Sequence, residues 1–303
     1  MIIREALAAA CADLAAAGID TPSLDAQLLL AFVFKINRTT LATRSAEPLS
    51  QENTEEFSAL VERRKKGECA AYILGKKEFR GLEFLVNPSV LVPRPDTETL
   101  VEAAITVIKE LLRMKNEKLR MSNEKAEGFD MSSANSIKVL DLCTGSGAVA
   151  IALKNEMPCL EVFAADISAE TLEIANENAR RLLGENQIHF YHSDLYDALP
   201  RSRFSLIVSN PPYIPSGEIQ TLSAEVQNEP RLALDGGKSG LEIISRIIDS
   251  TPDFLKRGGF LLLEADPRQM EKIASVLAGK GFYDIKLFKD LSGRERVIGG
   301  IFA

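Results

Sequence analysis

From Lys138 to the end of the 303-residue chain, apolar segments of strand length alternate with segments of helical periodicity. Strands are expected near 138–142, 160–165, 187–191, 203–209 and 259–264, and helices are expected to begin near Ser146, Ser168, Gly240 and Pro267. Such alternation predicts a doubly wound α/β fold, in which helices cover both faces of a mainly parallel sheet.

The end of the chain departs from this alternation. Residues Tyr283–Phe288 and Arg296–Phe302 both have strand-like sequences, and only Lys289–Glu295 lies between them. This connection is too short for the crossover that neighbouring parallel strands need. We therefore predict that the last two strands pair antiparallel.

The N-terminal part has a different pattern. Ala-rich and Leu-rich helical stretches are separated by Pro22 and Pro48, which predicts a small helical domain over 1–74. Two short alternating runs then flank Gly81 and predict a β-hairpin, so that 75–94 is expected to be a hairpin and connector.

The remaining residues, 95–303, form the predicted α/β domain. They include a polar insert at 114–136 with a near-duplication of seven residues. We expect a solvated helix extension or a loose loop there, because the insert has no apolar face to bury.

Composition and charge argue against binding to membranes or nucleic acids. The chain has 36 Lys and Arg residues against 43 Asp and Glu residues, which gives a net charge of −7. Its compact basic run, 63–66, is flanked by Glu62 and Glu68, whereas nucleic-acid-binding proteins usually carry a basic stripe. The longest apolar runs fall far short of the roughly 20 residues that span a bilayer. We therefore expect a cytoplasmic protein.

A turn of small residues follows the strand expected at 138–142, and it leads into a helix. It consists of Cys143, Thr144, Gly145, Ser146 and Gly147. The two glycines lack a Cβ that would block a ligand, and the start of the helix offers unpaired N–H groups. The next strand ends at Asp166, about 20 residues later, where such sheets bind a ribose diol. Enzymes that bind dinucleotides share these two signals.

A third signal is the tetrapeptide Asn210, Pro211, Pro212 and Tyr213, which directly follows the strand expected at 203–209. The prolines rigidify the loop and remove two N–H donors, which leaves carbonyl acceptors and the Asn210 amide. The loop is expected at the carboxyl edge of the sheet, where open α/β sheets bind ligands. We therefore predict that it lines a ligand site.

These motifs resemble those of class I methyltransferases, which use S-adenosyl-L-methionine (SAM), release S-adenosyl-L-homocysteine and modify planar nitrogens. A seven-stranded sheet with an antiparallel last strand is typical of that group. The closer resemblance is to the HemK/PrmC-type protein-(glutamine-N5) methyltransferases. It rests on the helical N-terminal domain, the hairpin, Pro93–Glu98, Asn210–Pro215, Glu225 with Val226, Glu229 with Pro230, Ala233–Leu241 and Asp290–Val297.

The resemblance implies how SAM is bound. Residues Cys143–Gly147 would line its methionine part, Asp166 would bind the ribose, and Asp194 with Leu195 would contact the adenine. Asp141 either accepts a hydrogen bond from the SAM ammonium group or only organises the turn. No metal is implied, because the two histidines, His189 and His192, fall on opposite faces of a strand.

The resemblance also implies the substrate, which is the Gln of the Gly-Gly-Gln motif in class 1 peptide chain release factors. Asn210 and the Pro211 carbonyl would accept the two N–H bonds of the substrate amide, Tyr213 would pack on the amide, and Pro212 would shape the loop. Asn210 would also lie close to SAM. An amide nitrogen is a poor nucleophile, so orientation would supply much of the catalysis.

Three alternatives stay open. One is a sister enzyme that methylates a glutamine of a ribosomal protein, although the N-terminal domain and the connector favour the release-factor type. A second is a DNA or rRNA exocyclic-amine methyltransferase, because the same loop suits such amines, and the acidic charge argues against it. The third, a SAM-binding protein without catalysis, is disfavoured because the tetrapeptide is intact.

Two single residues depart from the family pattern. Cys143 stands where many relatives carry Gly, and we expect it to be tolerated if its backbone does not need a positive φ. Leu195 stands where some relatives place an aromatic residue near the adenine, so apolar contact would replace stacking there.

Overall fold

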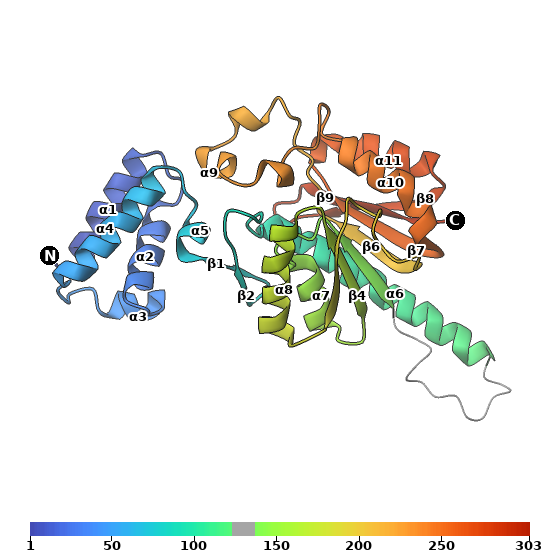
Figure 1. The fold of residues 1–303 in the computed structure, drawn as a ribbon, viewed down its shortest axis with the longest axis horizontal. Helices are drawn as coiled ribbons and strands as arrows, with labels where there is room; N and C mark the ends of the chain where they lie inside the picture. Colours follow the sequence, from blue (N-terminus) through green and yellow to red (C-terminus); the bar gives the residue numbers. More distant parts are fainter. Residues whose placement is uncertain (123–136) are drawn as a thin grey trace. The chain divides into compact units, whose positions relative to one another are not determined.

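The computed structural model describes residues 1–122 and 137–303, which form two compact units. The first unit comprises Met1–Lys77, Val86–Pro88 and Leu222–Glu229, and the second comprises Glu78–Leu85, Ser89–Thr221 and Pro230–Ala303. Figure 1 shows the elements of both units along the chain.

The first unit is helical, as predicted for the N-terminal part. Its helices are α1 (Ile3–Ala16), α2 (Pro22–Val33), α3 (Arg38–Thr43), α4 (Gln51–Lys65), α5 (Ala70–Leu74) and the short α9 (Ala224–Gln227). Leu14, Leu29 and Phe57 belong to its apolar core, to which α1, α2 and α4 each contribute a buried face.

A buried arginine joins α9 to this unit. Arg64 is 3% exposed, and its guanidinium contacts Asp25 Oδ2 and Glu225 Oε2, each at 2.7 Å. Asn228 Nδ2 donates to the Gly67 carbonyl at 2.9 Å. The segment Leu222–Glu229 therefore packs with the N-terminal helices, although it follows the Asn210 loop in sequence.

The predicted hairpin is formed by β1 (Lys76–Phe79) and β2 (Leu82–Leu85). Asn178, in helix α8 (Ala169–Leu183), accepts a hydrogen bond from the Leu85 N–H at 2.7 Å and donates one to the Leu85 carbonyl at 3.0 Å. Phe84 is fully buried in the core that it shares with the helices of the second unit. The second strand of the hairpin is thus anchored on α8.

The second unit contains a seven-stranded sheet in the order β5-β4-β3-β6-β7-β9-β8. Its strands are β3 (Lys138–Leu142), β4 (Glu161–Asp166), β5 (Ile188–His192), β6 (Phe204–Ser209), β7 (Leu255–Glu264), β8 (Phe282–Lys289) and β9 (Glu295–Phe302). The strands from β3 to β7 pair in parallel, whereas β9 pairs antiparallel with both β7 and β8. The predicted sheet and its antiparallel last strand are confirmed.

Helices cover both faces of this sheet (Figure 1). One face carries α6 (Glu98–Ser122), α7 (Ala148–Glu156) and α8, and the other carries α10 (Glu242–Phe254) and α11 (Met270–Gly279). Alternate residues of β3 serve the two cores, with Val139 in the first and Leu140 in the second. Because α6 continues to Ser122, the first part of the 114–136 insert is helical, and 123–136 lie outside the described residues.

No helix in the described part of the chain combines the length and the apolar character needed to cross a bilayer.

Candidate active site

The register of the sheet brings three predicted site residues, Asp166, Cys143 and Asn210, into a row with Glu264. Leu142 of β3 pairs with Ala165 of β4 and with Ser209 of β6, and Ser209 pairs with Leu263 of β7. Neighbouring strands lie about 4.8 Å apart. The next residues along the four strands, in their order across the sheet, are Asp166, Cys143, Asn210 and Glu264.

The glycine turn lies between β3 and α7. The Thr144 N–H donates to the Ala165 carbonyl at 3.1 Å, and both Gly145 and Gly147 have positive φ, +55° and +81°. A Cβ on Gly145 would meet no protein atom within 4 Å, so the space beside this residue is open. A Cβ on Gly147 would lie 2.9 Å from Ile151 Cδ1. Gly147 is therefore needed for packing against its own helix, and its role in clearing a ligand path stays a prediction.

Cys143 has a φ of +57°, so the condition on which we expected it to be tolerated is not met. A residue with a Cβ pays about 1 kcal/mol for this left-handed conformation, which explains why glycine suits the position. Desolvation raises the pKa of the Cys143 thiol, and Asp166 adds to the rise. The thiol is therefore protonated at neutral pH and is no candidate nucleophile.

Asp166 ties the turn to the end of β4. Its Oδ2 accepts the Gly145 N–H at 2.9 Å, and its Oδ1 accepts the Ser168 N–H at the start of α8 at 3.1 Å. Desolvation raises the pKa of Asp166, while these two backbone N–H donors lower it. The turn and the carboxylate thus meet, and the role of Asp166 toward a ribose stays a prediction.

Asp141 is buried in β3 behind the same turn. Its Oδ2 accepts hydrogen bonds from the Thr144 hydroxyl at 2.7 Å and from the Ala150 N–H at 3.2 Å. Desolvation raises the pKa of Asp141 to about 7. The organising role proposed for Asp141 is therefore present in the structure, and its carboxyl group is poised to change charge near neutral pH.

The segment after β5 carries the residues expected near the adenine. The Ser193 N–H donates to the Asp166 carbonyl at 2.9 Å, which holds this segment beside the end of β4. Leu195 is buried, with a φ of +52°. The Asp194 carboxylate pairs with Arg246 of α10 at 2.9 Å.

The loop after β6 presents an oriented amide. Asn210 Nδ2 donates to the hydroxyl of the buried Thr97 at 3.0 Å, and Pro211 is buried. The Tyr213 hydroxyl donates to Glu264 Oε1 at 3.5 Å. Desolvation raises the pKa of Tyr213, and the pKa of Glu264 rises to about 7 for the same reason. Tyr213 is therefore neutral at physiological pH.

A second segment supports this loop from behind. The Gly236 N–H donates to the Ile214 carbonyl at 2.9 Å, and Gln269 Nε2 donates to the Tyr213 carbonyl at 2.9 Å. Any side chain at Gly240 would collide with the Tyr213 carbonyl and with Gln269. The glycine-rich stretch Ala233–Leu241 thus allows close backbone packing against the Asn210 loop.

Two stretches of the family pattern meet beside the site. Arg296 of β9 pairs with Asp96 of the connector at 2.8 Å, and Arg294 pairs with Asp290 at 3.1 Å. Sequence reasoning singled out both stretches but missed Thr97 and Glu264 as site residues. The signal available was the position of Glu264 at the end of a buried apolar strand.

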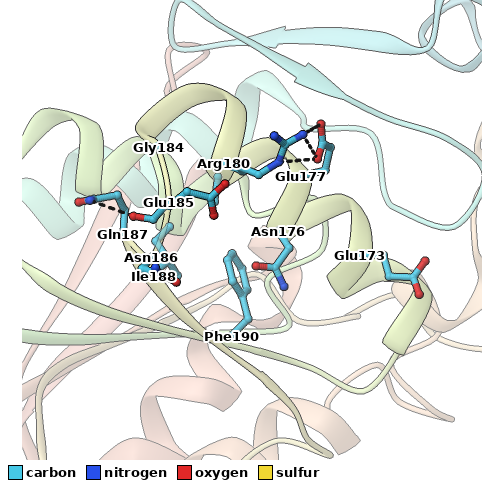
Figure 2. A pocket seen from close by; sticks show the side chains of 11 residues that line it. Glu173, Asn176, Glu177, Arg180, Gly184, Glu185, Asn186, Gln187, Ile188 and Phe190 are labelled. Atoms are coloured by element: carbon cyan, nitrogen blue, oxygen red, sulfur yellow. Dashed lines mark hydrogen bonds and ion pairs between the residues drawn. The ribbon is translucent and has the colours of Figure 1, made fainter.

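A separate hollow of about 350 Å³ lies between α8 and the amino end of β5 (Figure 2). Figure 2 shows the Arg180–Glu177 ion pair and Phe190 among its lining residues. Its residues Gly184–Gln187 precede β5, whereas the site residues follow the carboxyl ends of the strands. The hollow is therefore not part of the site.

The histidines lie on either side of β5 and have protein partners. The His189 ring lies tilted against Phe163, with centroids 4.8 Å apart, and His192 Nε2 hydrogen-bonds to the Ile167 carbonyl at 2.8 Å. Within residues 1–122 and 137–303, no cluster of three metal-ligating side chains occurs.

Comparisons with known sequences match both parts of the chain. The family described as PrmC N-terminal domain matches residues 5–75, and the family described as Methyltransferase small domain matches residues 127–279. A release factor glutamine methyltransferase of Coxiella burnetii is 41% identical over 278 residues, which is 92% of this chain and 91% of that protein. One of Geobacter sulfurreducens is 35% identical, over 95% of this chain and 92% of that protein.

Solved structures support the fold. The hMettl16 catalytic domain, solved in complex with MAT2A 3'UTR hairpin 6, matches with a TM-score of 0.55 at 13% identity, over 80% of this chain and 82% of that one. At this identity the likeness concerns the fold alone.

Proposed function

Because this chain belongs to the release factor glutamine methyltransferase family, we propose that it transfers a methyl group from SAM to a release factor. The acceptor would be the side-chain amide nitrogen of the Gln in the Gly-Gly-Gln motif of class 1 peptide chain release factors. The reaction would take place in the cytoplasm, where translation ends.

The residues around the glycine turn fit SAM. Gly145 leaves open space beside the turn, and the carboxyl groups of Asp141 and Asp166 offer acceptors that suit an ammonium group and a ribose diol. Leu195 offers a buried apolar side chain, and Asp194 a carboxylate, for the adenine. SAM supplies an electrophilic methyl group on a sulfonium centre.

The Asn210 amide carries the proposal for the substrate. Its nitrogen is engaged by Thr97, which leaves its side-chain oxygen as the end that can accept an N–H bond of the glutamine. The Pro211 carbonyl would accept the other N–H bond, while Tyr213 would pack on the flat amide. Because the two acceptors are already in place around the nitrogen, they would stabilise the charge that develops on it during transfer without having to reorient.

Charge supports a protein substrate over a nucleic acid. In the first unit, Arg63 pairs with Glu68, and Lys65 pairs with Glu62, so much of the basic run 63–66 is neutralised locally. Phosphate binding depends on unpaired basic groups. The helices of residues 1–74 would instead contact the release factor.

The test is methylation with labelled SAM, followed by mass spectrometry of the release factor peptide that contains the Gly-Gly-Gln motif. We expect one added methyl group on the Gln, and none on a release factor in which this Gln is Ala. Parallel reactions with ribosomal proteins and with rRNA or DNA fragments test the alternatives. Labelling of one of these in place of the release factor would overturn the proposal.

A further inference from the structure

A chain of hydrogen bonds connects the two polar side chains of the Asn210 loop. Asn210 Nδ2 donates to Thr97 Oγ1 at 3.0 Å, and the Thr97 hydroxyl also acts on the Glu264 carboxyl group, whose pKa it lowers. The Tyr213 hydroxyl donates to Glu264 Oε1 at 3.5 Å. One carboxyl group is therefore linked to Asn210 through Thr97 and to Tyr213 directly.

Burying these polar side chains costs folding free energy. Thr97 is 4% exposed and Glu264 is 1% exposed, and Glu264 Oε2 has no hydrogen-bond partner among the described residues. A buried carboxylate oxygen without a partner destabilises the fold, and an apolar side chain would avoid that cost. Thr97 belongs to the connector, where it is the last residue of the 3₁₀ turn Pro95–Thr97 that precedes α6.

The donors and acceptors of the chain decide which end of the Asn210 amide faces the substrate. A hydroxyl has one hydrogen to donate, and an ionised carboxylate can only accept. Thr97 favours the ionised form of Glu264, which requires its hydrogen to point toward the carboxylate, so that Thr97 offers Asn210 a lone pair. The lone pair on Thr97 favours the amide orientation in which the Asn210 nitrogen faces Thr97 and the Asn210 side-chain oxygen points away from it.

We propose that Thr97 and Glu264 are positioning residues, which hold the Asn210 oxygen in place to accept the glutamine N–H bond. This inference rests on the function proposed above. In this proposal neither residue contacts the substrate: Thr97 acts through Asn210, and Glu264 acts through Thr97 and through Tyr213.

The ionisation of Glu264 adds a testable consequence. The charged and titratable groups that act on Glu264 are Arg296, which favours its ionised form, and Asp96, which opposes it. Tyr213 donates to it, and Asp266 acts on Tyr213. With a pKa of about 7, a protonated Glu264 could donate to Thr97, and Thr97 could then donate to the wrong end of Asn210. The turnover rate should therefore fall as the pH drops below about 7.

The experiment is steady-state methylation of a class 1 release factor by the full-length enzyme at saturating SAM. We expect Thr97→Val to lower kcat by roughly tenfold or more, because it removes the acceptor for the Asn210 nitrogen. The SAM dissociation constant should change by less than about twofold, and Thr97→Ser should restore kcat to within about threefold of wild type. Glu264→Gln should flatten the fall in kcat between pH 8 and pH 6.

Thr251→Val is the matched control. Thr251 is a fully buried threonine of α10 whose hydroxyl donates to the Ile247 carbonyl at 2.7 Å, away from the Asn210 loop. It should lose stability but keep kcat at temperatures below its unfolding transition. In an Asn210→Ala background, Thr97→Val should have no further effect on kcat.

Two results would overturn the inference: a Thr97→Val enzyme with kcat within about twofold of wild type, or a full further loss in the Asn210→Ala background. If wild-type enzyme methylates no release factor, the proposed function is what fails. The two failures are thus distinguished by the wild-type reaction.

Discussion

Gly145 donates its backbone N–H to Asp166 Oδ2 at 2.9 Å, so the glycine turn after β3 and the end of β4 share one carboxylate. The Ser168 N–H occupies Oδ1 of the same group. A carboxylate has about four lone-pair sites, so these two bonds leave room for the hydroxyls of a ribose. The backbone N–H groups of the turn and the hydroxyls of a bound ribose could therefore use different lone pairs of the Asp166 carboxylate.

Replacing Asp166 with Ala should weaken SAM binding by roughly 1.5–3 kcal/mol, the usual worth of hydrogen bonds to a charged group. Calorimetric titration of the purified protein with SAM measures this change. Asp197→Ala, at an exposed position, is the control and should bind SAM as the wild type does. An unchanged affinity for Asp166→Ala would mean that Asp166 only caps the turn and α8.

Asn210→Ala should separate chemistry from cofactor binding. The amide is proposed to act on the acceptor nitrogen, so its loss should lower kcat by about 10²–10³, as for other preorganised groups that stabilise developing charge. Single-turnover methylation at saturating SAM measures the effect. Asn176→Ala, on the exposed side of α8, should leave the rate unchanged. A rate for Asn210→Ala within about tenfold of wild type would show that the loop is structural.

Asp141 should make stability depend on pH. Its pKa is raised from 3.8 to about 7 by burial, so the folded state favours the neutral form. This stabilisation is complete below about pH 4 and is lost as the pH rises through about 7. The free energy of unfolding of wild type, relative to Asp141→Asn, should therefore fall by about 2–3 kcal/mol between pH 5 and pH 7.

Urea unfolding of both proteins across this range tests the effect of Asp141. If the two curves of stability against pH run parallel, Asp141 does not titrate there. SAM binding gives a second readout. If the carboxylate accepts the ammonium group, affinity should rise with pH through about 7 in wild type and not in Asp141→Asn.

Arg64→Met should strongly destabilise the helical unit. It leaves the buried Asp25 carboxylate without its partner, a change that typically costs 3–5 kcal/mol. Arg63→Met is the matched control, because the Arg63–Glu68 pair is partly exposed and should be worth less than about 1 kcal/mol. Thermal unfolding, with hydrogen exchange of residues 222–229, measures both effects. Equal losses for the two variants would contradict this reading of the buried pair.

The sheet could be predicted from the sequence because its strands are nearly continuous apolar runs. Leu140, Leu206 and Leu262 lie in such runs and are fully or almost fully buried. The antiparallel pairing of the last two strands could be predicted from the length of their connection alone, since seven residues permit no crossover. The position of Asp166 beside the turn followed from the parallel register.

Other features could not be read from sequence for physical reasons. The positive φ of Cys143 could not be predicted, because a cysteine side chain does not indicate a left-handed backbone. Thr97, Asn210 and Glu264 meet only because the fold brings together residues more than 50 positions apart, and no local pattern encodes such a contact. The same holds for the pairing of Arg64 with Glu225.

The membership of Leu222–Glu229 in the helical unit limits how the two units can be recombined. A chimera that takes only the N-terminal helices from a relative would keep the α9 segment of this chain. That segment fits the native surroundings of Arg64 and Gly67, which the relative's helices would replace. An intact helical unit could therefore be transferred from a relative only by exchanging both pieces together. The helical unit is thus a discontinuous structural module, and its two parts are expected to change in concert.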